Sequence, residues 1–195
     1  AARGGCLAYQ ESSDYARGLD LAIQAERHER GEQRERAGQR EQGERWLLEN
    51  EVLRVVFNER GEITSILDKE TGQEWAAGPC NAFKLYKDVP SGWDAWDIDS
   101  MYEQTPVELN EPVQIEVVAQ GPLLARLRLS RQWHQSTLSQ EISLRRGSRQ
   151  VTFATTVDWQ ESHKLLKVAF PVNVHANEAI HEIQFGHIRR PNHRS

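Results

Sequence analysis

The fold is decided by the stretch Leu124-Ala125-Arg126-Leu127-Arg128-Leu129-Ser130-Arg131-Gln132-Trp133. Leu127 and Leu129 alternate with arginines, so one face of this segment is apolar and the other is polar. A period of two residues is typical of a strand in an antiparallel sheet that has one face on the core and one face in water. The stretch therefore predicts a strand and not a helix.

The chain on both sides of this stretch shows the same strand-like pattern. The candidate strands are 46–48, 51–57, 63–67, 82–86, 113–119, 124–133, 137–144, 150–157, 164–174 and 179–185. Turn sequences such as Gln120-Gly121-Pro122 and Arg146-Gly147-Ser148 separate several of them. Consecutive strands without helices between them predict a mainly β fold, an antiparallel β-sandwich.

The first 45 residues differ from the rest. Residues 8 to about 41 are predicted to form one α-helix, with Ser12 or Ser13 as its N-cap. The residues of its apolar face are Tyr15, Leu19, Ala22 and Ile23. Between residues 26 and 45 only Ala37 is apolar, so the helix is expected to fray into a solvated linker. The predicted parts are a helix with a linker over 1–45 and a β domain over 46–195.

Composition excludes several functional classes. Among 195 residues, 24 are Lys or Arg and 29 are Asp or Glu, which gives a net charge of −5 and no basic footprint for nucleic acid. No apolar run approaches the ~18 residues of a membrane helix. The two cysteines, Cys6 and Cys80, favour reduced thiols and a cytoplasmic location. No signal peptide is recognised at the start, and both ends look cut, so a fragment is expected.

The richest chemistry lies in Pro90-Ser91-Gly92-Trp93-Asp94-Ala95-Trp96-Asp97-Ile98-Asp99. Its indoles offer flat faces for the C–H side of a sugar ring, and its carboxylates offer acceptors for sugar hydroxyls. The predicted substrate-binding residues are Trp93, Asp94, Trp96, Asp97 and Asp99. From composition alone, buried tryptophans with turn-capping aspartates are the commoner arrangement. Both interpretations are therefore kept.

No complete catalytic or metal site is recognisable. His175, His181, His187 and His193 are spaced six apart, which on one strand separates neighbours by ~20 Å, too far to share an ion. Asp97 and Asp99 would lie ~6.6 Å apart on one face of a strand, a weak signal for a glycosidase carboxylate pair. Nucleophile and phosphate-binding motifs are missing. We predict no catalytic residue and no metal ligand.

Three groups of residues resemble glycoside hydrolase family 38 α-mannosidases. The first is Asp88-Val89-Pro90 followed by the segment from Trp93 to Asp99. The second is Val157-Asp158-Trp159 followed by the segment from His163 to Val172. The third is Glu182-Ile183-Gln184-Phe185-Gly186-His187 with Arg190-Pro191 and His193-Arg194. The resemblance covers residues 46–195 and is strongest for the bacterial and cytosolic branch.

The resemblance implies a retaining exo-glycosidase that removes α-linked mannose from oligosaccharides. It implies a galactose mutarotase-like β-sandwich over 46–195, truncated at its C-terminal end, and it makes residues 1–45 the last helix of a three-helix bundle with its linker. The implied partners are an α-mannoside oligosaccharide and the missing catalytic barrel and bundle helices. The implied cofactor is zinc, with its ligands outside this chain. A homo-oligomer is left open, and no nucleic acid or membrane is expected.

Three functions follow from these observations. The first is part of an α-mannosidase that supports the catalytic barrel and lines the rim of its substrate site with residues 90–99. The second is a carbohydrate-binding module without catalysis, and the third is a purely structural module in which Trp93 and Trp96 fill a domain joint.

Overall fold

The computed structural model describes residues 25–26, 45–94 and 96–192. Within these ranges it contains antiparallel strands, one short 3-10 helix, η1 (Tyr102–Gln104), and no α-helix. The strands are β1 (Ala25–Glu26), β2 (Arg45–Glu49), β3 (Leu53–Phe57), β4 (Ile63–Asp68), β5 (Ala82–Lys87), β6 (Pro106–Val107), β7 (Gln114–Gln120), β8 (Leu124–Trp133), β9 (Ser136–Arg145), β10 (Val151–Asp158), β11 (Lys164–Ala169), β12 (Glu178–Ile183) and β13 (Gly186–Pro191). The prediction of a mainly β, antiparallel fold is confirmed.

The first sheet has the strand order β1-β2-β3-β4. Leu48 of β2 pairs with Val55 of β3, and Phe57 lies two residues further along the same face. All three side chains are fully buried, while Arg54, which precedes Val55 on β3, is exposed. This alternation gives the sheet one face for the core and one face for solvent.

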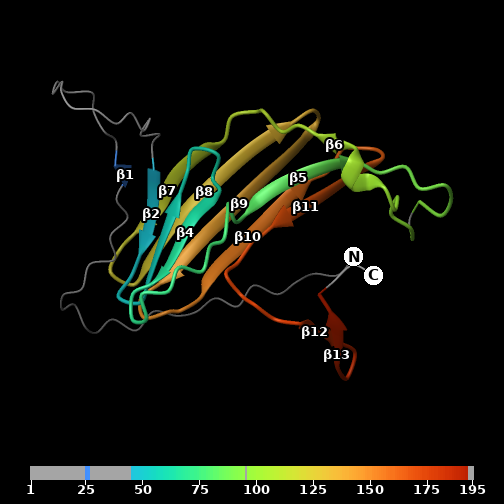
Figure 1. Cartoon of the computed structure of the whole chain (residues 1–195). Helices are drawn as coiled ribbons and strands as arrows, with labels where there is room; N and C mark the ends of the chain where they lie inside the picture. Colours follow the sequence, from blue (N-terminus) through green and yellow to red (C-terminus); the bar gives the residue numbers. More distant parts are fainter. Residues whose placement is uncertain (1–24, 27–44, 95, 193–195) are drawn as a thin grey trace, which may run out of the picture.

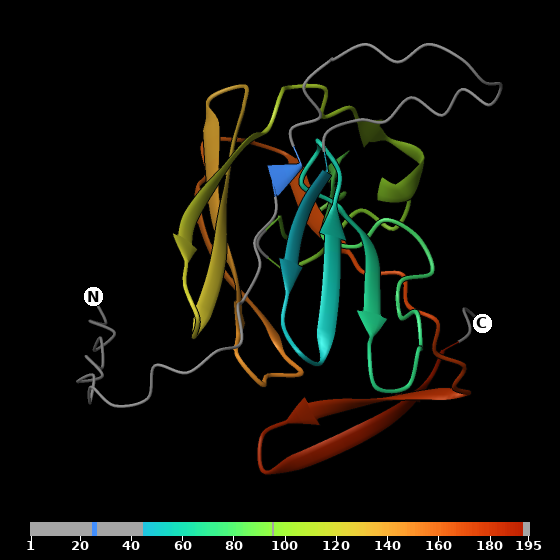
Figure 2. The same ribbon diagram turned by 90° about the vertical axis from the view of Figure 1, so that its left-hand side faces the viewer.

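The second sheet has the order β10-β9-β8-β7 and contains the longest strands. Leu127 and Leu129 of β8 are fully buried, and the arginines between and beside them point outward, as the alternation predicts. Figures 1 and 2 show that this sheet faces the first one. The buried core between them comprises Leu48, Val52, Leu53, Val55, Phe57, Ile63, Cys80, Ala125, Leu127, Leu129, Ile142 and Leu144.

Asn50 ties the two sheets together at one end of the core. Its Oδ1 accepts backbone hydrogen bonds from Val52 at 2.8 Å and Leu53 at 2.7 Å. Its Nδ2 donates to the carbonyl oxygens of Arg145 at 2.8 Å and Ser148 at 2.9 Å, which lie at the β9–β10 turn. Because the amide is buried, these four bonds satisfy groups that water does not reach.

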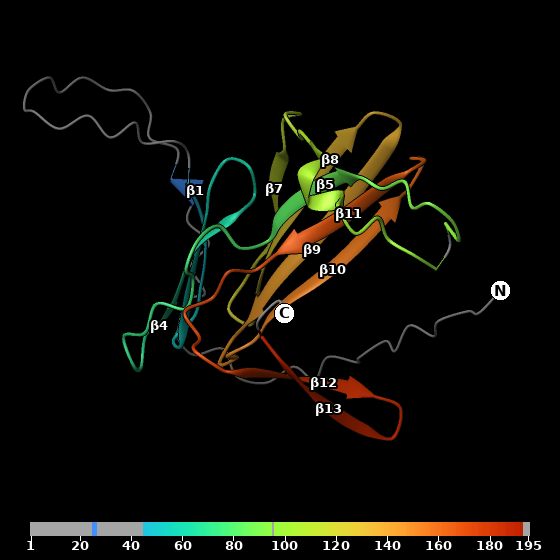
Figure 3. The same cartoon turned by 45° about the vertical axis from the view of Figure 1, so that its right-hand side comes forward.

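A third sheet, with the order β11-β5-β6, extends the structure beyond β8 and β9. Figures 1 and 3 show β5 and β11 running beside β9 and β10. A second buried cluster forms here around Leu85, Trp133 and Leu138, with Trp159 and Leu166 packed against it. This cluster fixes the end of β5, from which the Trp- and Asp-rich stretch departs.

Strands β12 and β13 form a separate two-stranded hairpin (Figure 3). Apart from Ala179, every residue of its two strands is exposed. The hairpin turns at Gln184 and Phe185, and Phe185 has a φ of 62°. Its own backbone bonds hold it together, and the two core clusters take no residue from it.

The predicted N-terminal helix falls almost entirely outside the described residues. Only Ala25 and Glu26 of it are described, and they form β1 and pair with Trp46 and Arg45 of β2. At these two positions the helix prediction is wrong, because the edge of β2 offers free backbone groups that an extended segment can pair with. No helix in the described part is long and apolar enough to span a membrane.

Candidate functional site

The Trp- and Asp-rich stretch lies in a loop, residues 88–101, that leaves β5 and returns through η1 to β6 (Figure 1). Its base is held from two sides by backbone hydrogen bonds. The N–H of Lys87 donates to the carbonyl of Thr105 at 2.9 Å, and the N–H of Asp88 donates to the carbonyl of His163 at 2.9 Å. The 88–101 loop is thus a long excursion with a fixed base, an arrangement that suits a binding loop on a rigid scaffold.

Three further hydrogen bonds shape the 88–101 loop from within. The carboxylate of Asp88 accepts the backbone N–H of Asp99 at 2.7 Å, which joins the two ends of the stretch. The carbonyl of Trp93 accepts the N–H groups of Trp96 at 2.7 Å and Asp97 at 2.9 Å, which forms a turn. Trp93 has a φ of 60°, a left-handed conformation that a non-glycine residue adopts only where its surroundings hold it there.

Both indoles stand in solvent. Trp93 is 77% exposed and Trp96 is 86% exposed, values far from those of Trp133, which is 2% exposed in the second core cluster. The interpretation that these tryptophans are core is therefore wrong for the described part of the chain. An exposed pair of large aromatic side chains marks a surface that meets a ligand or another part of a protein.

The carboxylates of Asp94 and Asp99 have different surroundings. Asp99 Oδ1 accepts the N–H of Met101 at 2.9 Å, so part of this carboxylate serves the turn before η1. Asp94 Oδ2 lies 3.9 Å from Nδ1 of His163, and both side chains are more than half exposed. Residues 97–99 form no strand, so the spacing that we predicted for Asp97 and Asp99 as neighbours on a strand does not apply.

A polar depression of about 330 Å³ opens beside the 88–101 loop. Asp88, Pro90 and Asp94 line one side, and Ser162, His163 and Lys164 line the other. The two sides are brought together because β11 pairs with β5, with Lys164 opposite Lys87. The depression offers carboxylate acceptors together with hydroxyl, ammonium and imidazole donors, the mixture that hydrogen-bonds a neutral polyhydroxylated ligand.

Aromatic and cationic contacts fix the returning end of the loop. The rings of Tyr86 on β5 and Tyr102 in η1 meet edge to face, with their centroids 5.1 Å apart. The ammonium of Lys167 on β11 lies 4.6 Å from the centroid of the Tyr102 ring and donates a hydrogen bond to its hydroxyl oxygen. These contacts anchor η1 on the third sheet and so fix where the loop ends.

A second polar cluster lies at the β8–β9 turn. Glu161 accepts a hydrogen bond from the hydroxyl of Ser136 at 2.9 Å and lies 3.2 Å from Nδ1 of His134. The hydrogen bond from Ser136 is the main influence that lowers the pKa of Glu161, and His134 adds to it. The Ser136 hydroxyl also accepts the N–H of Gln160 at 3.0 Å, so it is held in place and buried. This arrangement joins two chain segments and does not form an activated nucleophile, since His134 contacts the carboxylate and not the serine.

The described residues contain no group of three or more His, Cys, Asp or Glu side chains that could hold a metal ion. The described residues therefore do not fit a zinc site. The geometry supports binding, with a carboxylate-lined depression and two exposed indoles.

Sequence reasoning missed how distant residues complete the site. Ser162 and Lys164 reach the depression from β11 and the turn before it, more than 60 residues after the loop. His163 and Lys164 belong to the second group of residues that carries the family resemblance, so that match was the available signal. Asp88 was part of the first group, but nothing in the sequence indicated its bond to Asp99.

Comparison with known proteins gives one family. A family model described as the C-terminal domain of glycosyl hydrolases family 38 matches residues 48–195. Human "Alpha-mannosidase 2C1" is 40% identical over 154 residues, which are 75% of this chain and 14% of the relative. "Alpha-mannosidase" of Saccharomyces cerevisiae is 30% identical over 163 residues, 75% of this chain and 15% of the relative. The chain thus spans about a seventh of the length of these relatives.

A solved structure agrees with the fold. The crystal structure of an α-mannosidase from Enterococcus faecalis V583 superposes with a TM-score of 0.61 at 18% identity. The match covers 76% of this chain and 20% of that one. At this identity the similarity concerns the fold alone.

Proposed function

The chain belongs to glycoside hydrolase family 38, and from this membership we propose that it is part of a retaining exo-α-mannosidase that hydrolyses terminal α-linked mannose from oligosaccharides. The observation that carries the proposal is the match of the family's C-terminal domain over residues 48–195. Relatives named α-mannosidase, at up to 40% identity, support the same activity. The domain is proposed to be a galactose mutarotase-like β-sandwich that supports the catalytic barrel.

In this proposal the 88–101 loop lines the rim of the substrate site. The exposed faces of Trp93 and Trp96 stack on the C–H side of a sugar ring, and Asp94, Asp97 and Asp99 accept hydrogen bonds from its hydroxyls. Support comes from the exposure of both indoles and from the polar depression beside Asp94. Asp88 keeps the two ends of the stretch together, so it positions the residues that meet the sugar.

The residues that break the glycosidic bond are proposed to lie outside this chain, as is the zinc site. When bound there, zinc would contact the mannose hydroxyls. The described residues contribute binding and orientation only. A cytoplasmic location is part of the proposal and is supported by Cys80, which is a buried free thiol.

A second candidate function is a carbohydrate-binding module without any hydrolase activity. The same exposed indoles favour it, because a binding surface on a β domain needs no catalytic group. The assay that separates the two is turnover of an aryl α-mannoside by the full-length protein. Turnover supports the hydrolase, and sugar binding without turnover supports the module.

The rim proposal is tested by Trp93→Ala and Trp96→Ala in the full-length protein. Each change removes a stacking face worth about 0.5–1.5 kcal/mol. We expect kcat/KM for an α-mannoside to fall about 2- to 12-fold, with most of the change in KM.

Leu123→Ala is the matched control, because Leu123 is an exposed apolar residue at the β7–β8 turn, far from the loop in the fold. Its kinetics should equal those of the unmodified protein. If Trp93→Ala and Trp96→Ala leave KM unchanged but lower the unfolding temperature, the two indoles fill a domain joint and the rim role is wrong.

A further inference from the structure

The outward face of the second sheet is divided into two halves of different chemistry. In one half, Arg128 forms ion pairs with Glu116 at 2.8 Å and Glu141 at 2.8 Å, and Arg126 pairs with the same Glu141 at 2.9 Å. Charged side chains there pair with one another across β7, β8 and β9. Hydrogen bonding by Arg128 holds the pKa of Glu141 below its ordinary value, consistent with a closed network.

The other half of the same face carries only uncharged polar side chains on these three strands. By register, Gln114 of β7 lies opposite Ser130 of β8, and Ser130 lies opposite Ser139 of β9. The next pair along is Gln132 with Thr137. None of these five side chains forms a hydrogen bond with another residue of the described part, so their donors and acceptors face outward unused.

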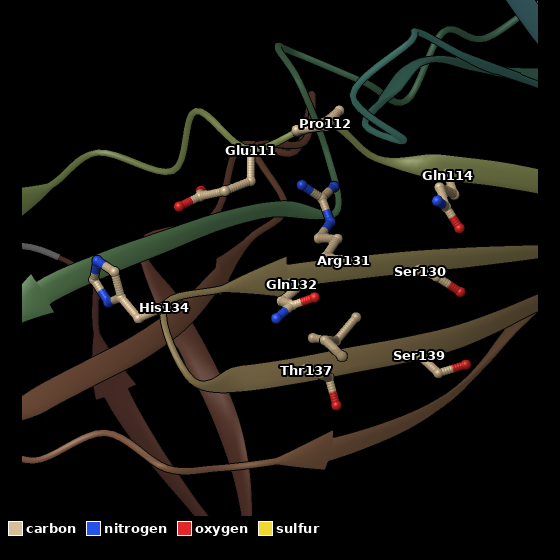
Figure 4. Close-up of a pocket in the computed structure, with 10 residues that line it drawn as sticks. Glu111, Pro112, Gln114, Ser130, Arg131, Gln132, His134, Thr137 and Ser139 are labelled. Carbon is tan, nitrogen blue, oxygen red and sulfur yellow. The ribbon is translucent and has the colours of Figure 1, made fainter.

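These side chains line a groove and not a flat surface. The groove has a volume of about 630 Å³ and is bounded by Glu111 and Pro112, which precede β7 (Figure 4). His134 closes the end at the β8–β9 turn. Figure 4 shows the guanidinium of Arg131 reaching from β8 toward the segment of Glu111 and Pro112.

Arg131 belongs to the core-facing side of β8 and contributes to one wall of the groove. Its guanidinium donates to the carbonyl of Arg60 and lies over the ring of Phe83, 5.2 Å from the centroid. Its Nε is buried and has no hydrogen-bond partner within the described ranges. Burial lowers the pKa of Arg131. Arg126 Nε in the charged half is buried without a partner in the same way, so the groove is distinguished by its outward-facing polar side chains and not by Arg131.

From this arrangement we propose that the groove binds a neutral oligosaccharide chain, at a place separate from the 88–101 loop. Amide and hydroxyl groups both donate and accept, as sugar hydroxyls do, so rows of them match a polyol better than a charged ligand. The wall carries the carboxylate of Glu111 and the guanidinium of Arg131, so one charge of each sign lines the groove and neither sign of ligand is selected. The volume is sufficient for a short stretch of pyranose rings. The inference goes beyond the proposed function, because it requires no hydrolysis.

The test is native electrophoresis of the full-length protein through gels that contain yeast mannan, dextran or polygalacturonate, each compared with a gel without polymer. We expect retardation by at least one of the two neutral polymers and none by polygalacturonate. The double variant Gln132→Ala/Ser139→Ala removes groups that hydrogen-bond the ligand. It should raise the apparent dissociation constant for the polymer, obtained from the retardation, about fivefold or more. Ser139→Leu, which fills the groove without offering a hydrogen bond, should have the same effect.

The matched control is Ser143→Ala, which changes a serine on the same strand and the same outward face but outside the groove. It should be retarded like the unmodified protein. Thermal melts check that each variant is folded, and exposed polar positions of this kind rarely alter stability by more than about 0.5 kcal/mol.

Three results would overturn the proposal: no retardation of the unmodified protein by either neutral polymer, equal retardation of all variants, or stronger retardation by polygalacturonate. Trp96→Ala measured in the same gels reports on the 88–101 loop separately. Since the experiment measures binding and not hydrolysis, the groove proposal can be wrong while the hydrolase proposal is right, and the reverse.

Discussion

Glu74 shows how a single carboxylate can hold a segment in place. It accepts hydrogen bonds from the hydroxyl of Ser65 at 2.6 Å and from the backbone N–H groups of Ile66 at 2.7 Å and Ala76 at 2.9 Å. Burial by itself raises the pKa of Glu74, but these bonds and one from the Trp75 N–H outweigh it, so the net pKa lies below its ordinary value. The ionised form is therefore the one that the fold stabilises.

This shift predicts a dependence of stability on pH. Because the folded pKa is lower than the unfolded one, the contribution of Glu74 is complete above the unfolded value and is lost as pH falls through the folded value. Glu74→Gln should lower the free energy of unfolding at neutral pH by about 1–3 kcal/mol, because hydrogen-bond donors lose their acceptor. The difference from the unmodified protein should shrink in acid.

Urea unfolding at about pH 7 and about pH 3 measures this, since the slope with pH reports bound protons. Glu59→Gln is the control, because Glu59 is exposed and makes no hydrogen bond within the described part. If the difference in unfolding free energy between Glu74→Gln and the unmodified protein is the same at both pH values, Glu74 is not the cause of the loss of stability in acid.

At the scale of elements, two turns place glycine in the same backbone conformation for different reasons. Gly61 in the β3–β4 turn has a φ of 68°, and a Cβ at this position would lie 2.8 Å from Cδ1 of Leu129 in the core. Gly72, in the turn after β4, has a φ of 71°, and a Cβ there would meet nothing within 4 Å. The first turn packs on the second sheet, while the second turn is open to solvent.

The pair predicts two different costs for the same substitution. Gly72→Ala should destabilise by about 1–2 kcal/mol, the cost of a left-handed conformation for an L-residue. Gly61→Ala should add an overpacking cost of about 1–3 kcal/mol, because Leu129 has to move. Denaturant unfolding of the two variants measures the difference. Equal losses of unfolding free energy would show that the Leu129 side chain moves aside at no cost.

The first and last residues of the strands show where the sequence pattern predicts poorly. The alternation in 124–133 correctly predicted β8, since Leu127 and Leu129 face the core. The candidate strand 164–174 was too long: β11 ends at Ala169, before Pro171, which has no N–H to donate to a ladder. The strand at 186–191 was not predicted, because its His, Arg and Pro residues give no apolar–polar alternation, although it pairs with β12.

For the whole molecule, the β12–β13 hairpin stands apart from the two cores. Ile180 is 62% exposed, and Phe185 at the turn is fully exposed. A lone two-stranded hairpin is marginally stable in water, because it buries little apolar surface. The backbone bonds of β12 and β13 are therefore expected to open more easily than those of the described strands β8 and β9.

Hydrogen exchange followed by mass spectrometry tests this at the scale of the molecule. In the isolated chain, amides of residues 178–191 should exchange much faster than those of β8 and β9, whose strands are paired on both sides. In the full-length protein, slower exchange in the same residues is expected where further chain covers them. Equal protection of the hairpin and of β8 in the isolated chain would contradict this account.

The sequence by itself determined the class of fold, the family and the composition of the candidate site. Alternation of apolar and polar residues requires only that one face of a strand be buried, so it is readable without knowing the partner strand. The presence of Trp93, Asp94, Trp96, Asp97 and Asp99 in one stretch likewise needs no structure. Those five residues stay the predicted sugar-binding set.

Only the tertiary structure decided that both indoles stand in solvent, that Asp88 joins the ends of the loop, and that His163 and Lys164 complete its depression. It also decided that the outward face of the second sheet has a charged, paired half and a neutral, unpaired half. The physical reason is that these features depend on strand register and on contacts between residues far apart in the chain. Local pattern fixes which side a residue faces, whereas strand pairing fixes which residues it meets there.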